Sequence, residues 1–141
     1  NICHRFLFIT PNVDILTEVL DGCCIKPEEY IVVCSKFEDV PKYLSAADLG
    51  IVVMDKPKIA MAIKTAEYLA VGLPVITNAN LGGAKEIVEE NNVGIVHDID
   101  SNLADLERFI EKSRIEDVHS RVLRTSRVAV DGHPFFLPRQ R

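Results

Sequence analysis

The chain has 141 residues, is 48% hydrophobic and 26% charged, and carries a formal net charge of -5 at pH 7. These values match ordinary soluble globular domains and exclude a disordered chain, a collagen-like chain and a small disulfide scaffold. The acidic balance also argues against a general nucleic-acid-binding protein. No apolar run approaches the roughly 20 residues that cross a bilayer, and no signal-peptide pattern is present. The length predicts a single domain over residues 1–141 with its own core.

Short apolar blocks alternate with segments of helical spacing along the chain. The expected strands are 5–9, 30–34, 49–54, 74–77 and 93–97. The expected helices between and after them are 13–20, 40–47, 63–70, 84–91 and 103–112. Ser101 is the expected N-cap of the helix over 103–112.

Most of the expected strands are continuous and rich in β-branched residues, which is typical of strands buried on both faces. The strands start about twenty residues apart, as in right-handed βαβ units. The sequence therefore predicts an α/β fold with a doubly wound parallel sheet, Rossmann-like, in three layers α/β/α.

The two ends of the chain differ from its middle. The first residue is Asn1 rather than Met, so we expect the sequence to begin inside a longer chain or after processing. A final helix is expected over 117–130, with Arg121, Arg124 and Arg127 on one side. That side could meet anionic lipid or a phosphate-bearing acceptor, but a solvated face is the simpler interpretation, and nothing else supports membrane association. Residues 131–141 are expected to be a docking tail or a flexible one.

The four cysteines are Cys3, Cys23, Cys24 and Cys34. None forms a C-x-x-C pair, neighbouring cysteines rarely reach disulfide geometry, and no Cys/His spacing suits zinc. We therefore expect free thiols and no metal site. Cys34 ends an apolar run and is expected to be a small buried hydrophobe. Free thiols favour a reducing compartment, so a cytoplasmic location is expected.

Ligands of open parallel sheets bind at the carboxyl ends of strands, where helix N-termini offer free N–H groups. The helix expected after the strand 49–54 carries Lys64 and Glu67, three residues apart on one face. A lysine near the first turn can pair with phosphate, and a carboxylate one turn later can accept bonds from the hydroxyls of a ribose. Spacing alone favours the simpler interpretation, a surface ion pair worth a few tenths of a kcal/mol.

A second candidate loop follows the expected strand 74–77. Gly82 and Gly83 stand at the start of a helix, where the backbone can approach a ligand closely. Any strand-to-helix turn can use such a pair, so the signal is weak. The chain has neither G-x-G-x-x-G nor G-x-x-x-x-G-K-[ST], which excludes a dinucleotide fingerprint and a P-loop.

Residues 64–98, with 40–53 before them, resemble the donor-binding half of nucleotide-sugar glycosyltransferases of the two-Rossmann (GT-B) class, group 1 and family 4-like. The family pattern runs K-x-x-E-Y-L-A-x-G-x-P-V-I, then a glycine-containing loop, then E-x-[IV] and a later glycine. The resemblance covers about 6–112. The matching residues are Lys64, Glu67, Tyr68, Leu69, Ala70, Gly72, Pro74, Val75, Ile76, Gly82, Gly83, Glu86, Ile87 and Gly94.

This resemblance implies the C-terminal donor-binding domain of an enzyme. Such enzymes move a sugar from a nucleoside-diphosphate sugar to an acceptor, in glycan or polysaccharide biosynthesis. The donor would be a substrate, with no tightly bound cofactor and no metal. The N-terminal acceptor domain would be missing from the sequence, so this chain alone is expected to be inactive.

The resemblance also implies roles for single residues. Glu67 matches the glutamate that binds the ribose hydroxyls, and Lys64 matches the basic residue on the donor side of the same helix. Gly82 and Gly83 match the loop that passes near the nucleotide or the sugar. We expect the backbone N–H groups of Gly82, Gly83 and Ala84 to stabilise the departing diphosphate, with Lys64 as the cation. Gly72 matches a helix C-cap that needs the left-handed region.

The sequence departs from the family near the transferred sugar. Ile59 stands where many relatives have a second glutamate, and Met61 and Ala62 stand in place of Ser-Pro. The family's first strand and its phosphate loop, which precede the strand matched by 5–9, are also not in the sequence.

Two other functions stay open at this point. A receiver-like signalling domain would use Asp55 as phospho-acceptor, but the first expected strand lacks the acidic pair that receivers need. Half of a sugar-nucleotide epimerase would share the nucleotide-binding architecture.

Overall fold

The structure is a computed structural model that describes residues 5–57, 63–98 and 100–115. The predictions made for Cys3, Ile59, the final helix over 117–130 and the tail over 131–141 lie outside the described residues. The chain divides into two compact units, Asn1–Tyr43 and Leu44–Arg141, and each is described here by itself. A single domain over 1–141 stays a prediction.

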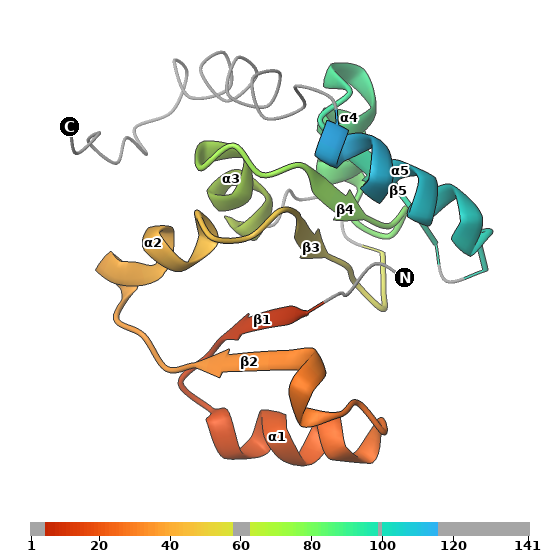
Figure 1. The fold of residues 1–141 in the computed structure, drawn as a ribbon. Helices are drawn as coiled ribbons and strands as arrows, with labels where there is room; N and C mark the ends of the chain where they lie inside the picture. The colour runs from red at the N-terminus through yellow and green to blue at the C-terminus, as the bar shows by residue number, and fades with distance from the viewer. Residues whose placement is uncertain (1–4, 58–62, 99, 116–141) are drawn as a thin grey trace. The chain divides into compact units, whose positions relative to one another are not determined.

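The first unit pairs two strands beside one helix (Figure 1). Strands β1 and β2 are parallel, with Phe6 opposite Tyr30 and Ile9 opposite Val33. Among the described apolar side chains of this unit, only Leu20 is buried. The elements are β1 (Phe6–Ile9), α1 (Val13–Gly22), the 3-10 turns η1 (Pro27–Glu29) and η2 (Phe37–Asp39), β2 (Tyr30–Val33), and most of α2 (Val40–Leu44).

The second unit is a three-stranded parallel sheet in the order β3-β4-β5, with helices joining its strands (Figure 1). Gly50 lies opposite Val75, which in turn lies opposite Gly94, so the three strands are in register. The elements are β3 (Gly50–Val52), α3 (Ile63–Ala70), β4 (Val75–Thr77), α4 (Gly82–Asn91), β5 (Gly94–Val96) and α5 (Leu103–Ile115).

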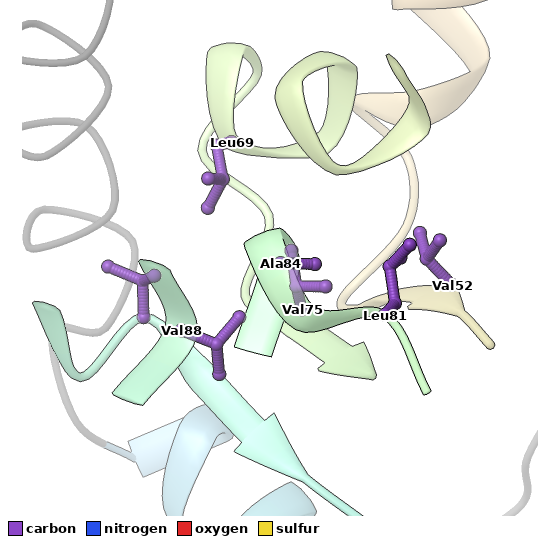
Figure 2. Packing of buried hydrophobic residues seen from close by; sticks show 7 residues of the cluster. Val52, Leu69, Val75, Leu81, Ala84 and Val88 are labelled. Atoms are coloured by element: carbon purple, nitrogen blue, oxygen red, sulfur yellow. The ribbon is translucent and has the colours of Figure 1, made fainter. Parts of the chain in front are cut away.

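The hydrophobic core of the second unit lies between the sheet and the helices α3 and α4. Figure 2 shows Leu69 from α3 and Val88 from α4 near strand residues of the same cluster. Leu81, just before α4, is 1% exposed and belongs to this cluster, as does Val93, just before β5. The full cluster is Val52, Leu69, Val75, Leu81, Ala84, Val88 and Val93.

Two glycines of the second unit are required by close packing. A Cβ on Gly94 would overlap the carbonyl oxygen of Val75 on the neighbouring strand. A Cβ on Gly50 would overlap the ring of Tyr68, so this glycine lets the ring of α3 lie directly on β3. Gly72, after α3, has φ of +87°, which confirms the left-handed C-cap predicted for it.

The α/β class, the parallel pairing and the order of strands and helices are confirmed. The strands form two separate sheets among the described residues, one of two strands and one of three. Most boundaries fall within a few residues of the predicted ones. The helix expected over 40–47 already ends at Leu44, and the one expected from Ala84 begins at Gly82.

Three expectations about burial and capping were wrong. Cys34 is exposed, because β2 ends at Val33 and the thiol follows the strand. Ile51 and Val53 are 47% and 55% exposed, because burial alternates along β3 and Val52 faces the core of the described second unit. The cap at the start of α5 is Asn102, whose Oδ1 accepts the N–H of Ala104 at 3.0 Å. Ser101 instead accepts the N–H of Asp98 through its hydroxyl.

Candidate functional site

The candidate site is the carboxyl edge of the three-stranded sheet. Strands β3, β4 and β5 end side by side at Val52, Thr77 and Val96. Helices α3 and α4 each connect two parallel strands, so each must run back along the sheet and begin near this edge. The loops and first helical turns at this edge therefore carry the groups that could meet a ligand.

The turn after β4 is joined to the loop after β3 by asparagine side chains. The Oδ1 of Asn78 accepts the backbone N–H of Met54 at 3.1 Å, and its Nδ2 donates to the Met54 carbonyl at 2.8 Å. The Nδ2 of Asn80 donates to the same carbonyl at 3.0 Å and lies 3.3 Å from the carbonyl oxygen of Asp55. The loop after β3 is thereby fixed to the turn that leads into α4.

The same turn is also joined to the loop after β5. The backbone N–H of Ala79 donates to Oδ1 of Asp98 at 2.8 Å. The N–H of His97 donates to the Thr77 carbonyl at 2.7 Å and extends the ladder beyond the strands. Hydrogen bonds thus hold all three loops at the carboxyl edge together.

Helix α4 begins at this edge without a side-chain cap. Its N-cap position is Leu81, which makes no side-chain capping bond, and Gly82, Gly83 and Ala84 form the first turn. The first N–H groups of a helix have no partner within the helix. With the helix dipole they form a ready site for an anion. The two glycines leave the backbone open, whereas the Ala84 side chain is buried in the core.

Lys64 and Glu67 of α3 bind each other. The Nζ of Lys64 lies 2.7 Å from Oε2 of Glu67, in the i, i+3 arrangement expected from their spacing. The lysine side chain is 58% exposed and the glutamate side chain 21%. The carboxylate is therefore the more fixed partner, and the ammonium is the one that can swing toward a ligand.

Tyr68, next to Glu67, packs its ring against β3 at Gly50. Burial raises the pKa of its phenol above the ordinary 10.0, nearby Lys64 lowers that pKa, and Glu67 raises it. Burial is the largest of these causes, so the ring stays neutral and fixes the helix that carries the ion pair.

The structure brings the predicted residues together in two groups. Lys64 and Glu67 form one, and Gly82, Gly83 and Ala84 form the other; no hydrogen bond or ion pair joins the two groups in the part of the chain that the structure describes. The roles assigned to these residues stay predictions.

The sequence analysis missed Asn78 and Asn80. The only signal available was a pair of amide side chains directly after a buried strand. Among the described residues no cluster of three His, Cys, Asp or Glu side chains could hold a metal ion. No helix in the same residues is long and apolar enough to span a membrane.

Comparisons with known proteins identify the family. The family model described as "Glycosyl transferases group 1" matches residues 7–112, three quarters of the chain. The chain belongs to the group 1 glycosyltransferases. The match spans both candidate helices and the turn between β4 and α4, so this carboxyl edge is that of a group 1 glycosyltransferase domain.

Solved structures share the fold of this glycosyltransferase domain. One of them is the crystal structure of WaaG, "a glycosyltransferase involved in lipopolysaccharide biosynthesis", with a TM-score of 0.63 and 18% sequence identity. The similarity covers 92% of this chain and 34% of the WaaG chain, so the domain spans about a third of that protein. No curated protein gives a significant match. The family match favours a glycosyltransferase over the receiver domain with Asp55 and over the epimerase half.

Proposed function

We propose that this chain binds the nucleoside-diphosphate sugar donor of a glycosyltransferase that acts in glycan biosynthesis. The observation that carries the proposal is the match of residues 7–112 to the group 1 glycosyltransferases. The acceptor domain would be a separate part of a longer enzyme. The coverage of only 34% of the WaaG chain supports that arrangement.

The diphosphate of the donor fits the start of α4. Gly82, Gly83 and Ala84 offer backbone N–H groups at a helix N-terminus whose N-cap residue, Leu81, makes no side-chain capping bond. Negative charge develops on the diphosphate as the bond to the sugar breaks. Fixed N–H dipoles stabilise that charge without having to reorganise during the reaction.

The ribose of the donor fits Glu67. Its Oε2 is held by Lys64, and its Oε1 makes no hydrogen bond within the described residues. A carboxylate oxygen can accept two bonds, so the two vicinal hydroxyls of a ribose match its capacity. Lys64 would leave or share Glu67 and turn toward the diphosphate, where it would be the catalytic cation.

The contribution of Glu67 can be tested by calorimetric titration with ADP, GDP and UDP. For the nucleotide that binds most tightly, we expect Glu67→Ala to weaken the affinity about tenfold or more, because the ribose hydroxyls lose a charged acceptor. Glu111→Ala on α5 is the control, since it removes the same charge from an exposed helical position. Equal affinities for wild type and Glu67→Ala would contradict the ribose assignment.

Lys64 has a matched control in the other unit. Lys42 also pairs with a carboxylate three residues away, here one that precedes it in the chain, with Nζ 2.6 Å from Oδ1 of Asp39. We expect Lys64→Ala to weaken nucleoside diphosphate binding more than nucleoside binding, because only the diphosphate carries charge. Lys42→Ala should leave both affinities unchanged. A loss of equal size for nucleoside and nucleoside diphosphate would show that Lys64 does not act on the phosphates.

A further inference from the structure

The loop after β3 is held by side chains of another loop. In a parallel sheet, backbone groups of neighbouring strands pair with each other, and Val52 opposite Thr77 is the last such pair between β3 and β4. Beyond it, the Asn78 side chain takes over. Its amide bonds both the N–H and the carbonyl of Met54, at 3.1 Å and 2.8 Å. The two backbone groups also fix the orientation of the amide, since only its oxygen can face the N–H.

Asn80 reinforces the same point. Its Nδ2 donates to the Met54 carbonyl at 3.0 Å and also lies near the carbonyl of Asp55. The Met54 carbonyl thus accepts hydrogen bonds from two donors. The Met54 side chain packs against the hydrophobic core. The loop after β3 therefore leaves the sheet from a point fixed by both packing and hydrogen bonds.

The position of these asparagines links two parts of the candidate site. They lie in the short turn between β4 and α4, with Leu81 between Asn80 and Gly82. The loop that they hold leads along the chain toward α3, which carries Lys64 and Glu67. In the proposed site, the ribose of the donor contacts Glu67 and its diphosphate contacts the start of α4. Both contacts can form together only if the distance between Glu67 and the start of α4 is fixed.

We propose that Asn78, assisted by Asn80, is a positioning residue that fixes the loop after β3 against the N-terminus of α4 and so sets the spacing for a nucleoside diphosphate. This inference rests on the proposed donor-binding function. The amide contacts no ligand in this account. It acts through the backbone of Met54, and the amide of Asn80 acts through the carbonyls of Met54 and Asp55.

Titrations of the protein with ADP, GDP, UDP and inorganic pyrophosphate test this role. For the tightest nucleoside diphosphate we expect Asn78→Ala to raise Kd about tenfold, which corresponds to one or two net hydrogen bonds. Pyrophosphate should lose less than about threefold, because it needs the diphosphate end alone. Asn80→Ala, which leaves both bonds of Asn78, should give an intermediate rise in Kd for the nucleoside diphosphate.

Asn91→Ala is the matched control. Its Nδ2 also donates to a backbone carbonyl, that of Ile87 at 3.0 Å, but at the other end of α4. If Asn78 had a purely structural role, Asn78→Ala would lower the melting temperature. Its Kd, measured at a temperature well below that melting temperature, would then equal the wild-type value. Kd values for Asn78→Ala and Asn91→Ala that both equal wild type would overturn the inference while leaving donor binding intact.

The other outcomes are equally decisive. A wild-type protein that binds none of the nucleoside diphosphates would overturn the proposed function and this inference with it. Equal losses for the nucleoside diphosphate and for pyrophosphate would overturn the spacing role. If Asn78→Ala does not fold by circular dichroism, Asn80→Ala decides: an unchanged Kd overturns the inference, and a raised Kd with unchanged pyrophosphate binding supports it.

Discussion

The two compact units use their polar side chains in different places. In the second unit, Asn78, Asn80 and Asp98 join the loops at the carboxyl ends of the strands. In the described part of the first unit, the side-chain bond between distant loops lies at the amino ends of β1 and β2, from Nε of Arg5 to the Glu28 carbonyl. The edge where α/β folds bind ligands is therefore braced in the second unit.

The second unit also has the larger hydrophobic core. Leu20 is the only buried apolar side chain among those described in the first unit, whereas the second unit contains a contiguous cluster. A sheet of two strands is marginal by itself, and three strands with a covered face can be stable. We expect the second unit to dominate the measured stability and to hold the ligand edge rigid.

The largest expected effect compares one glycine from each unit. Gly94→Ala places a Cβ on the Val75 carbonyl oxygen, so β4 and β5 must separate, and we expect a loss above about 3 kcal/mol in free energy of unfolding. Gly22→Ala, at the end of α1, meets nothing within 4 Å and should be neutral or stabilise by up to about 1 kcal/mol. Urea denaturation measures both, and similar losses would erase the difference between the units.

A side-chain deletion sharpens the comparison of the cores. Leu81→Ala removes a side chain that is 1% exposed, and we expect a loss of about 3 kcal/mol. Ile15→Ala on α1 removes one that is 64% exposed and should cost less than about 0.5 kcal/mol. Equal melting temperatures of the two variants in thermal denaturation would contradict this account.

A smaller effect concerns two threonines. The Thr77 hydroxyl is buried without a hydrogen-bond partner among the described residues, so Thr77→Val should be neutral or raise the free energy of unfolding by up to about 1 kcal/mol. The Thr17 hydroxyl donates to the Val13 carbonyl at 2.9 Å, and Thr17→Val should lower stability by about 0.5–1 kcal/mol. Chemical denaturation measures both variants. A loss of stability in Thr17→Val without a loss in Thr77→Val would support the unsatisfied Thr77 hydroxyl, and a destabilised Thr77→Val would contradict it.

The smallest effect is a pH dependence. Burial raises the pKa of Tyr68 above 10.0, so folding favours the neutral phenol. The stabilisation is fully present below pH 10 and is lost as pH rises through the raised pKa. Tyr68→Phe should therefore flatten the fall of unfolding free energy above pH 10. An unchanged slope in the variant would mean that the ring is not buried in solution.

The sequence predicts the α/β alternation well because each element has a local cause. Apolar β-branched runs form the strands, and spacing of three or four residues places the helices. The left-handed conformation of Gly72 was predicted from the family resemblance, in which it matches a helix C-cap.

Features that depend on neighbours in space were not predictable. Cys34 and Ile51 look buried in sequence, but the point where β2 ends and the face of β3 that is covered decide their exposure. The Lys64–Glu67 pair follows from helical spacing, whereas the bond from Asn78 to Met54 joins residues 24 apart, so no local pattern reveals it.

The central claim is that the carboxyl edge of the second unit binds a nucleoside diphosphate. The most direct measurement is amide NMR during titration of the protein with ADP, GDP or UDP. We predict that the amide signals of Gly82, Gly83 and Ala84 and those near Glu67 shift most, while the signals of residues 5–43 stay in place. Shifts concentrated in residues 5–43, with the first turn of α4 unchanged, would contradict the claim.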